Sequence, residues 1–125
     1  MNTFKNKVST EDYAIKAKQD MYSYLSTNFD DETIETLVKT VIVTIEEYLE
    51  SIKTNITLQD PKELLSNFHA FQGMLMNLGL NREAETAKII QNMLKDGNIN
   101  NINPHVEDFT HKLSNLLIVL QNNPA

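Results

Sequence analysis

His69 has the clearest potential for chemistry in this chain, because its neighbours predict that it projects from a helix into solvent. The apolar residues around it recur at alternating spacings of four and three residues, which predicts an amphipathic helix with one buried stripe. That stripe consists of Leu64, Phe68, Phe71, Leu75 and Leu78. At about 100° per residue, His69 lies roughly 140° around the helix from the centre of the stripe. An exposed imidazole can act as a nucleophile, although a lone surface histidine is most often without function.

The neighbours of His69 on the same helix face are unusual for a surface that meets solvent. Gly73 stands one turn further along, although glycine inside a helix costs roughly 1 kcal/mol relative to alanine. A missing side chain lets a bulky group or another backbone come close to the imidazole. Apolar residues also share this face, which is typical of a docking surface. The residues that we assign to partner binding are Leu65, Ser66, Met76 and Leu80. The alternative is that the three apolar ones pack beneath an N-terminal helix.

The residues from His69 to Gly73 read His-Ala-Phe-Gln-Gly, and the pair Leu78-Gly79 follows. This pattern closely resembles the signature of histidine-containing phosphotransfer (HPt) domains. In that family the order is His, any residue, an apolar residue, usually Lys, then Gly, with a Leu-Gly or similar pair ending the helix. The resemblance covers residues 9–122. It implies an all-α fold, an antiparallel up-down four-helix bundle with an additional N-terminal helix.

Gln72 is the one departure from this signature, because it stands where the family usually has lysine. It offers a neutral amide in place of a charge, and a charge-assisted hydrogen bond is roughly twice as strong as a neutral one. Two interpretations follow. Gln72 is either a tolerated substitution close to the phosphoryl group or the mark of a domain that docks receivers without carrying phosphate.

Composition limits the other classes of function. A length of 125 residues suits one domain, and 41% hydrophobic with 22% charged residues is ordinary for a globular protein. The net charge of -6 argues against a nucleic-acid partner, since such binding rests largely on Lys and Arg. The absence of cysteine excludes disulfides and thiolate chemistry. No apolar run is long enough to span a membrane, and none follows Lys5 and Lys7 as in a signal peptide. We therefore expect a cytoplasmic protein. We also expect a monomer, although the sequence does not itself give the oligomeric state.

The first half of the chain predicts two helices before the histidine helix. Residues 1–8 are polar, and we expect a flexible tail there, with a single domain from 9 to 125. Ser9 begins a start signal for a first helix that ends near Asn28. Asp30 can cap the second helix, whose apolar residues keep the four-three spacing over more than five turns.

The histidine helix itself has clear boundaries. Asp60 is its expected cap, Pro61 suits the first helical position, and Glu63 completes a capping box. Residues 56–59 connect it to the preceding helix, and Gly79 closes it.

Two more helices complete the predicted fold. Asn81 is the expected cap of the fourth helix, which carries Lys95 in its last turn and stops at Gly97. A solvated connector follows, and Asn103-Pro104 opens the last helix. Five helices with short connections favour an antiparallel bundle.

Antiparallel pairing places Gln91 opposite His69. The turn between their helices centres near Leu80, so residues equally far before and after it lie at the same level. The Gln91 amide can then accept a hydrogen bond from Nδ1–H of His69, which leaves Nε2 with its lone pair outward. Otherwise Gln91 is a polar residue at the rim of the interface. In HPt domains a glutamine at this offset orients the histidine, and a basic residue one turn further on lies near the phosphoryl group. Here that residue is Lys95, which can also serve only the helix C-terminus.

The resemblance implies a function as an intermediate of a two-component phosphorelay. Nε2 of His69 attacks a phosphoaspartate on a response-regulator receiver domain, or takes phosphate from a histidine kinase, and passes it on. Imidazole is largely neutral at pH 7, because the ordinary pKa of a histidine side chain is about 6.5. The receiver supplies Mg²⁺, so no cofactor of this chain's own is expected. Such a protein is neither kinase nor phosphatase.

Two alternatives remain open. One is an HPt-like module that docks and regulates receivers or kinases without phosphorylation, and the other is a helical adapter unrelated to signalling. A metal site in a bundle would need Glu-x-x-His on two helices, and only Asp108 and His111 come near that pattern. We expect no metal, and we interpret His105 and His111 as solvated.

Overall fold

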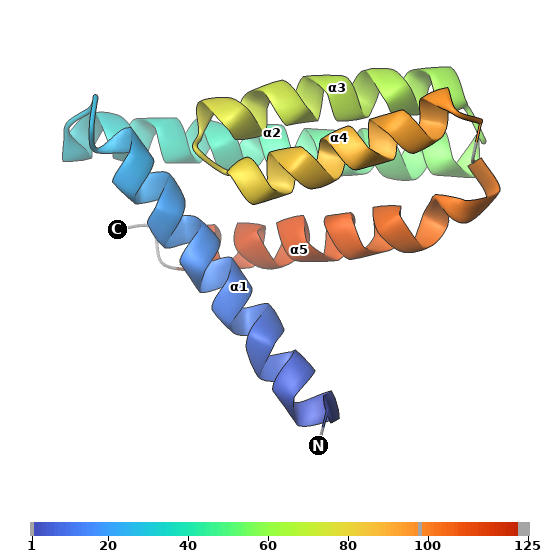
Figure 1. Cartoon of the computed structure of the whole chain (residues 1–125). Coiled ribbons are helices and arrows are strands. Elements are labelled where there is room, and N and C mark those ends of the chain that lie inside the picture. Colours follow the sequence, from blue (N-terminus) through green and yellow to red (C-terminus); the bar gives the residue numbers. More distant parts are fainter. Residues whose placement is uncertain (1, 98, 123–125) are drawn as a thin grey trace.

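The computed structural model describes residues 2–97 and 99–122, and within these ranges it contains helices and no strands. The elements are α1 (Asn2–Leu25), α2 (Asp31–Thr57), α3 (Pro61–Asn77), α4 (Asn81–Lys95), the short 3₁₀ helix η1 (Ile99–Asn101) and α5 (Asn103–Asn122), as Figure 1 shows. The predicted all-α class is therefore confirmed. Among the described residues, no helix combines the length and the hydrophobicity that a bilayer-spanning segment requires.

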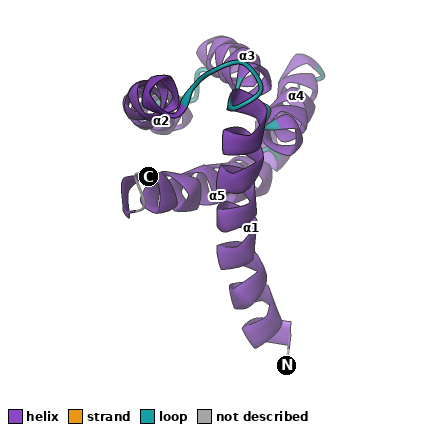
Figure 2. Cartoon of the chain, turned by 90° about the vertical axis from the view of Figure 1, so that its left-hand side faces the viewer, coloured by secondary structure: helices purple, strands orange, loops and turns teal. Residues whose placement is uncertain are grey.

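The hydrophobic core receives residues from all five α-helices, and α2 to α5 contact one another in sequence around it. α2 contacts α3 and α5, α3 contacts α4, and α4 contacts α5, so the contacts form a closed ring. In Figure 1 the chain reverses direction at each connection from α2 to α5. α1 packs across α5, and its N-terminal part extends away from the other helices in both views (Figures 1 and 2).

The apolar stripe of α3 is buried in the centre of this ring, as its spacing predicted. All five stripe residues are at most 7% exposed. Phe68 and Phe71 each pack edge-to-face against Phe109 of α5, with ring centroids 5.4 and 5.2 Å apart. Phe71 also lies against Tyr48 of α2 at 5.0 Å. These contacts fix the rotation of α3 about its axis, so His69 must face outward.

The predicted caps of α2 and α3 are present. The carboxylate of Asp30 accepts a hydrogen bond from the backbone N–H of Thr33 at 2.8 Å. Asp60 does the same for Glu63 at 3.1 Å, and Pro61 is the first residue of α3. The reciprocal half of the expected capping box is not used, because the N–H of Asp60 donates to the carbonyl of Asn55 at 3.0 Å.

The predicted cap of α4 was wrong. Asn81 is the first residue of the helix, and the N-cap position belongs to Leu80, which makes no side-chain cap hydrogen bond. The N–H of Leu80 donates to the carbonyl of Leu75 at 2.9 Å, and its side chain is buried. The chain therefore enters α4 one residue earlier than the polar cap signal indicated.

The start of α1 also differs from the prediction. The helix begins at Asn2 rather than Ser9, so most of the expected flexible tail is helical, and Met1 lies outside the described residues. No proline or glycine interrupts residues 2–8, and a helix can therefore continue through them. α1 ends at Leu25, before Asn28, and α2 runs on to Thr57, through the start of the expected connector 56–59.

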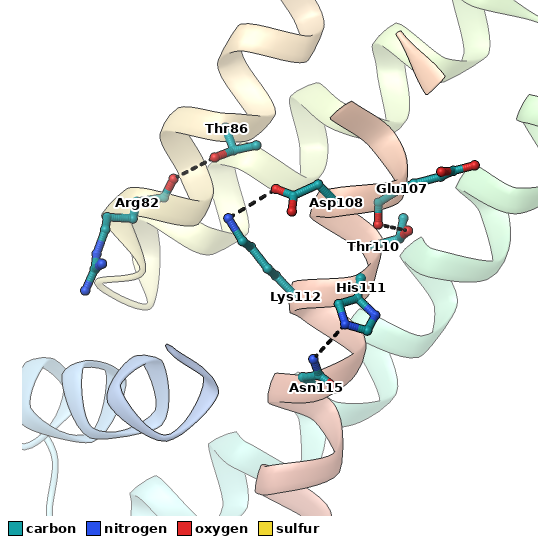
Figure 3. A network of polar contacts seen from close by, with 8 residues as sticks. All are labelled: Arg82, Thr86, Glu107, Asp108, Thr110, His111, Lys112 and Asn115. Carbon is teal, nitrogen blue, oxygen red and sulfur yellow. Dashed lines mark hydrogen bonds and ion pairs between the residues drawn. The ribbon is translucent and has the colours of Figure 1, made fainter. Parts of the chain in front are cut away.

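Tyr13 holds α1 against α4 and α5. Its ring lies 5.4 Å from the guanidinium of Arg82 and 4.9 Å from the ammonium of Lys112, within cation–π range of both. Figure 3 shows these two cations in the corner between α4, α5 and the blue ribbon of α1. Burial raises the pKa of Tyr13, and so does its hydrogen bond to Glu83. The tyrosine is thus neutral at physiological pH.

Gly79 explains how α1 can also lie against the turn between α3 and α4. Its φ is +75°, in the left-handed region that favours glycine. A Cβ at this position would overlap the ring of Tyr24 of α1. Gly97, which ends α4, has a similar φ of +79° but no neighbour within 4 Å of an added Cβ.

These two glycines allow the α1 contact to be tested separately from backbone strain. We expect Gly97→Ala to lower the free energy of unfolding by about 1 kcal/mol, the cost of a left-handed conformation with a side chain. Gly79→Ala should cost about 2 kcal/mol or more, because the Tyr24 ring must also move. Urea unfolding followed by circular dichroism measures both. Equal losses would show that the contact between Tyr24 and the turn contributes no stability.

Candidate functional site

His69 lies exposed on α3 and makes the hydrogen bond that the helix register predicted. Its Nδ1 is 3.3 Å from Oε1 of Gln91 on α4. Gln91 is only 4% exposed, so the contact lies at the edge of the buried interface between the two helices. The imidazole is therefore held at one nitrogen while the rest of the ring faces outward.

The other contacts of Gln91 decide which nitrogen of His69 carries the proton. Nε2 of Gln91 donates to the backbone carbonyls of Phe68 and Ala87, at 3.3 and 3.2 Å, and to Oε1 of Gln72 at 2.7 Å. A backbone carbonyl can only accept, so this end of the amide must be its NH₂ group. Oε1 then faces His69, and Nδ1 must be the donor. In the neutral ring Nε2 is left unprotonated, which is the form that a nucleophile needs.

Gln72 is half-buried beside this pair. Its carbonyl oxygen accepts from Gln91, so its own NH₂ group is the end that remains to donate elsewhere. The contact between Gln72 and Gln91 was not predicted from the sequence. The predicted position of Gln72 near a phosphoryl group stays a prediction.

Gly73 is exposed and has open space around it. A Cβ added there would meet no atom within 4 Å, apart from the helix's own nearby backbone. Packing inside the molecule therefore gives no reason for a residue that weakens the helix.

The predicted docking residues separate into two groups. Ser66 is exposed and Met76 is 53% exposed, so both are accessible on the face of His69. Leu65 is partly buried and packs against the core. Leu80 is 1% exposed, and its assignment to an exposed docking surface was wrong. Its place at the start of α4 directs it into the core instead of onto the helix face.

Two exposed lysines of α4 lie on the same flank of Gln91 in the helical register. Lys95 lies one turn after Gln91 and Lys88 lies three residues before it, and both are exposed. Helical side chains lean towards the N-terminus of their helix. Lys95 therefore leans towards the level of His69, and Lys88 leans away from it. The sequence interpretation missed Lys88, although its spacing from Gln91 places it on the same flank.

The residues that came nearest to a metal pattern have other partners. On α5, Asp108 pairs with Lys112 at 3.1 Å, and Asn115 lies 3.3 Å from His111, as Figure 3 shows. In the part of the chain that the structure describes, no three His, Cys, Asp or Glu side chains are grouped as a metal site requires.

Comparison with known proteins identifies the family of the chain. The family model of the Hpt domain matches residues 36–122, which is well over half of the 125 residues. This segment includes α3, α4 and α5 and most of α2, whereas α1 lies outside it. No curated protein and no solved structure matches the chain significantly. The chain thus belongs to the Hpt domain family, the phosphotransfer-type signalling modules of two-component systems.

Proposed function

We propose that this protein is a phosphorelay intermediate that accepts a phosphoryl group on His69 and passes it to a receiver domain. The donor is a receiver phosphoaspartate or a histidine kinase. The observation that carries the proposal is the orientation of Gln91, whose amide contacts leave Nε2 of His69 unprotonated on an exposed face. That nitrogen needs no further base to act as a nucleophile.

The imidazole of His69 loses no proton or other group during the transfer step. The Nε2 lone pair attacks phosphorus, an N–P bond forms, and the P–O bond to the aspartyl group breaks. The aspartate leaves as a carboxylate with the bonding electrons. His69 keeps its Nδ1 proton, so the phosphorylated ring is positively charged, and the carbonyl oxygen of Gln91 faces that charge. Mg²⁺ on the receiver neutralises the phosphoryl oxygens, and this chain needs no cofactor of its own. The reverse reaction uses the same contacts.

The helices suit this role as a rigid support. We assign α2 to α5 to an antiparallel up-down four-helix bundle and α1 to an additional N-terminal helix. Residues 9–125 then form one domain, and the helical turns of α1 before residue 9 extend from it. The ring of helix contacts and the buried aromatic residues of α3 support this assignment.

The partners follow from the family and from the face around His69. Hpt domains typically interact with receiver domains and histidine kinases. Ser66, Gly73 and Met76 form the accessible part of this face, with Leu65 at its edge. The open space at Gly73 supports close approach of a partner backbone to the imidazole.

A second candidate function keeps the docking surface and omits the phosphate. Gln72 gives the site no cation, and its carbonyl is engaged by Gln91, which favours a module that docks receivers or kinases without phosphorylation. Family membership disfavours the third possibility, a helical adapter unrelated to signalling.

Phosphorylation of His69 separates the first two functions. The wild type should gain one phosphate from phosphorylated receivers with Mg²⁺, and the phosphate should be lost on acidification because an N–P bond is acid-labile. Intact-protein mass under alkaline conditions measures this. His69→Gln should gain none and still bind receivers, whereas His111→Gln, a matched change at another exposed histidine, should behave as wild type. Receiver binding without any phosphate on the wild type would favour the docking module.

Lys95 is the proposed source of positive charge beside the phosphoryl group. We expect Lys95→Gln to slow transfer about tenfold, as loss of a charge-assisted contact predicts. Lys88→Gln is the matched control, because it removes the same charge from the same helix at a side chain that leans away. Rapid-quench kinetics with a phosphorylated receiver measure both rates. Equal losses of transfer rate in the two variants would mean that only net charge matters. If Lys95→Gln lowered the free energy of unfolding and left the transfer rate unchanged, Lys95 would serve only the helix C-terminus.

We expect Gly73 to lower the stability of α3 and to give a partner access to His69. Gly73→Ala is expected to raise the free energy of unfolding by about 0.5–1 kcal/mol, because alanine is the better helix former. The same change should weaken receiver binding and slow transfer, since the added methyl group occupies the open space. Ser51→Ala is the control, because it favours helix formation at an exposed position of another helix, α2, and should leave transfer unchanged. A stabilised Gly73→Ala variant with normal binding and transfer would remove the docking role of this glycine.

A further inference from the structure

We infer that Gln72 is a positioning residue, whose carbonyl oxygen acts together with the backbone carbonyls of Phe68 and Ala87 to hold the Gln91 amide and thereby the tautomer of His69. The contact runs from Oε1 of Gln72 to Nε2 of Gln91, and from Oε1 of Gln91 to Nδ1 of His69. The importance of this chain of contacts for transfer rests on the proposed function. The effect on the tautomer does not, and it can be measured without any partner.

The distances single out Gln72 among the groups that contact the Gln91 amide. Its 2.7 Å contact is the shortest, and the carbonyls of Phe68 and Ala87 lie at 3.3 and 3.2 Å. Those two carbonyls are inside α3 and α4, where each already accepts the N–H four residues further on. Among the described residues, the Gln72 oxygen accepts from no second protein donor. It is therefore the strongest of the groups that keep the NH₂ end of Gln91 turned away from His69.

Rotation of the Gln91 amide by half a turn would reverse the chemistry of His69. The NH₂ group would then face Nδ1, which could only accept from it, and the neutral ring would carry its proton on Nε2. A ring protonated at Nε2 has no lone pair to offer a phosphoryl group from its exposed side. The backbone carbonyls of Phe68 and Ala87 oppose this rotation, and an acceptor at position 72 adds to their effect, whereas a donor-only side chain there would work against it.

Lysine at this position therefore has two opposing effects in this chain. Its ammonium carries three donors and no acceptor, so it would meet the NH₂ group of Gln91 donor to donor. It would supply charge near the phosphoryl group and at the same time release the amide that orients the histidine. Glutamate has the opposite character, because its carboxylate keeps the acceptor and removes the Gln72 NH₂ group.

The experiment measures the tautomer of His69 directly. Long-range ¹H–¹⁵N spectra of labelled protein distinguish Nδ1–H from Nε2–H rings, and they are recorded well above the ordinary histidine pKa of about 6.5 so that the ring is neutral. The variants are Gln72→Glu, Gln72→Leu and Gln72→Lys, with Gln91→Leu as the reference for complete loss of the contact. The exposed rings of His105 and His111 serve as internal controls in every spectrum.

The wild type and Gln72→Glu should both be mainly the Nδ1–H tautomer. Gln72→Leu should raise the population of the Nε2–H tautomer severalfold, and this increase should be at least half of the increase that Gln91→Leu produces. Gln72→Lys should raise the population further. Rescue by glutamate is the outcome that a merely structural role would not produce. If the ratio of the two tautomers in Gln72→Leu were the same as in the wild type, the inference would be overturned. Loss of the Nδ1–H form in Gln72→Glu would also overturn it.

The two proposals fail in different ways. If the tautomer responds to Gln72 as expected and the wild type never takes up phosphate, the positioning role stands and the relay function fails. If the wild type is phosphorylated on His69 and the tautomer ignores Gln72, the relay function stands and the positioning role fails. Thermal melting of each variant confirms that it is folded, which the partly exposed position of Gln72 favours.

Discussion

Burial of one face of α3 is the constraint on which the rest of the structure depends. Phe68 and Phe71 must both reach Phe109 of α5, and their edge-to-face packing leaves α3 a single rotation about its axis. His69 lies between them in sequence and is therefore directed outward. The exposure of the imidazole is thus a consequence of the core and needs no separate interaction to maintain it.

Gln91 adds a polar contact to this apolar interface. A buried amide is costly unless its donors and acceptor are satisfied, and here every end of the amide has a partner on α3 or α4. The same hydrogen bonds that make the burial acceptable also orient His69. Stability and the proposed chemistry of His69 are therefore coupled at this residue, because the groups that satisfy the amide also hold its orientation.

The glycines show how one residue type serves different physical needs. Gly79 and Gly97 end helices with positive φ, and Gly79 also leaves room for Tyr24 of α1. Gly73 has neither property, since it lies inside a helix with open space around it. A residue that weakens its helix without serving the fold points to an interaction outside the molecule. The open space at Gly73 thus supports the proposed docking face independently of the family match.

Local patterns in the sequence determined the order of the five α-helices, the buried stripe of α3, the caps at Asp30 and Asp60, and the stops at Gly79 and Gly97, because each depends on residues within one or two turns. They did not determine where α1 begins. The sequence also placed Gln91 opposite His69, because in two antiparallel helices residues equally far from the connecting turn lie at the same level. Tertiary structure alone decided the burial of Leu80, which displaced Asn81 as the cap of α4. It also decided the contact between Gln72 and Gln91. Spacing gives the level and the face of a side chain, whereas the choice among hydrogen-bond partners depends on rotamers that neighbouring helices select together.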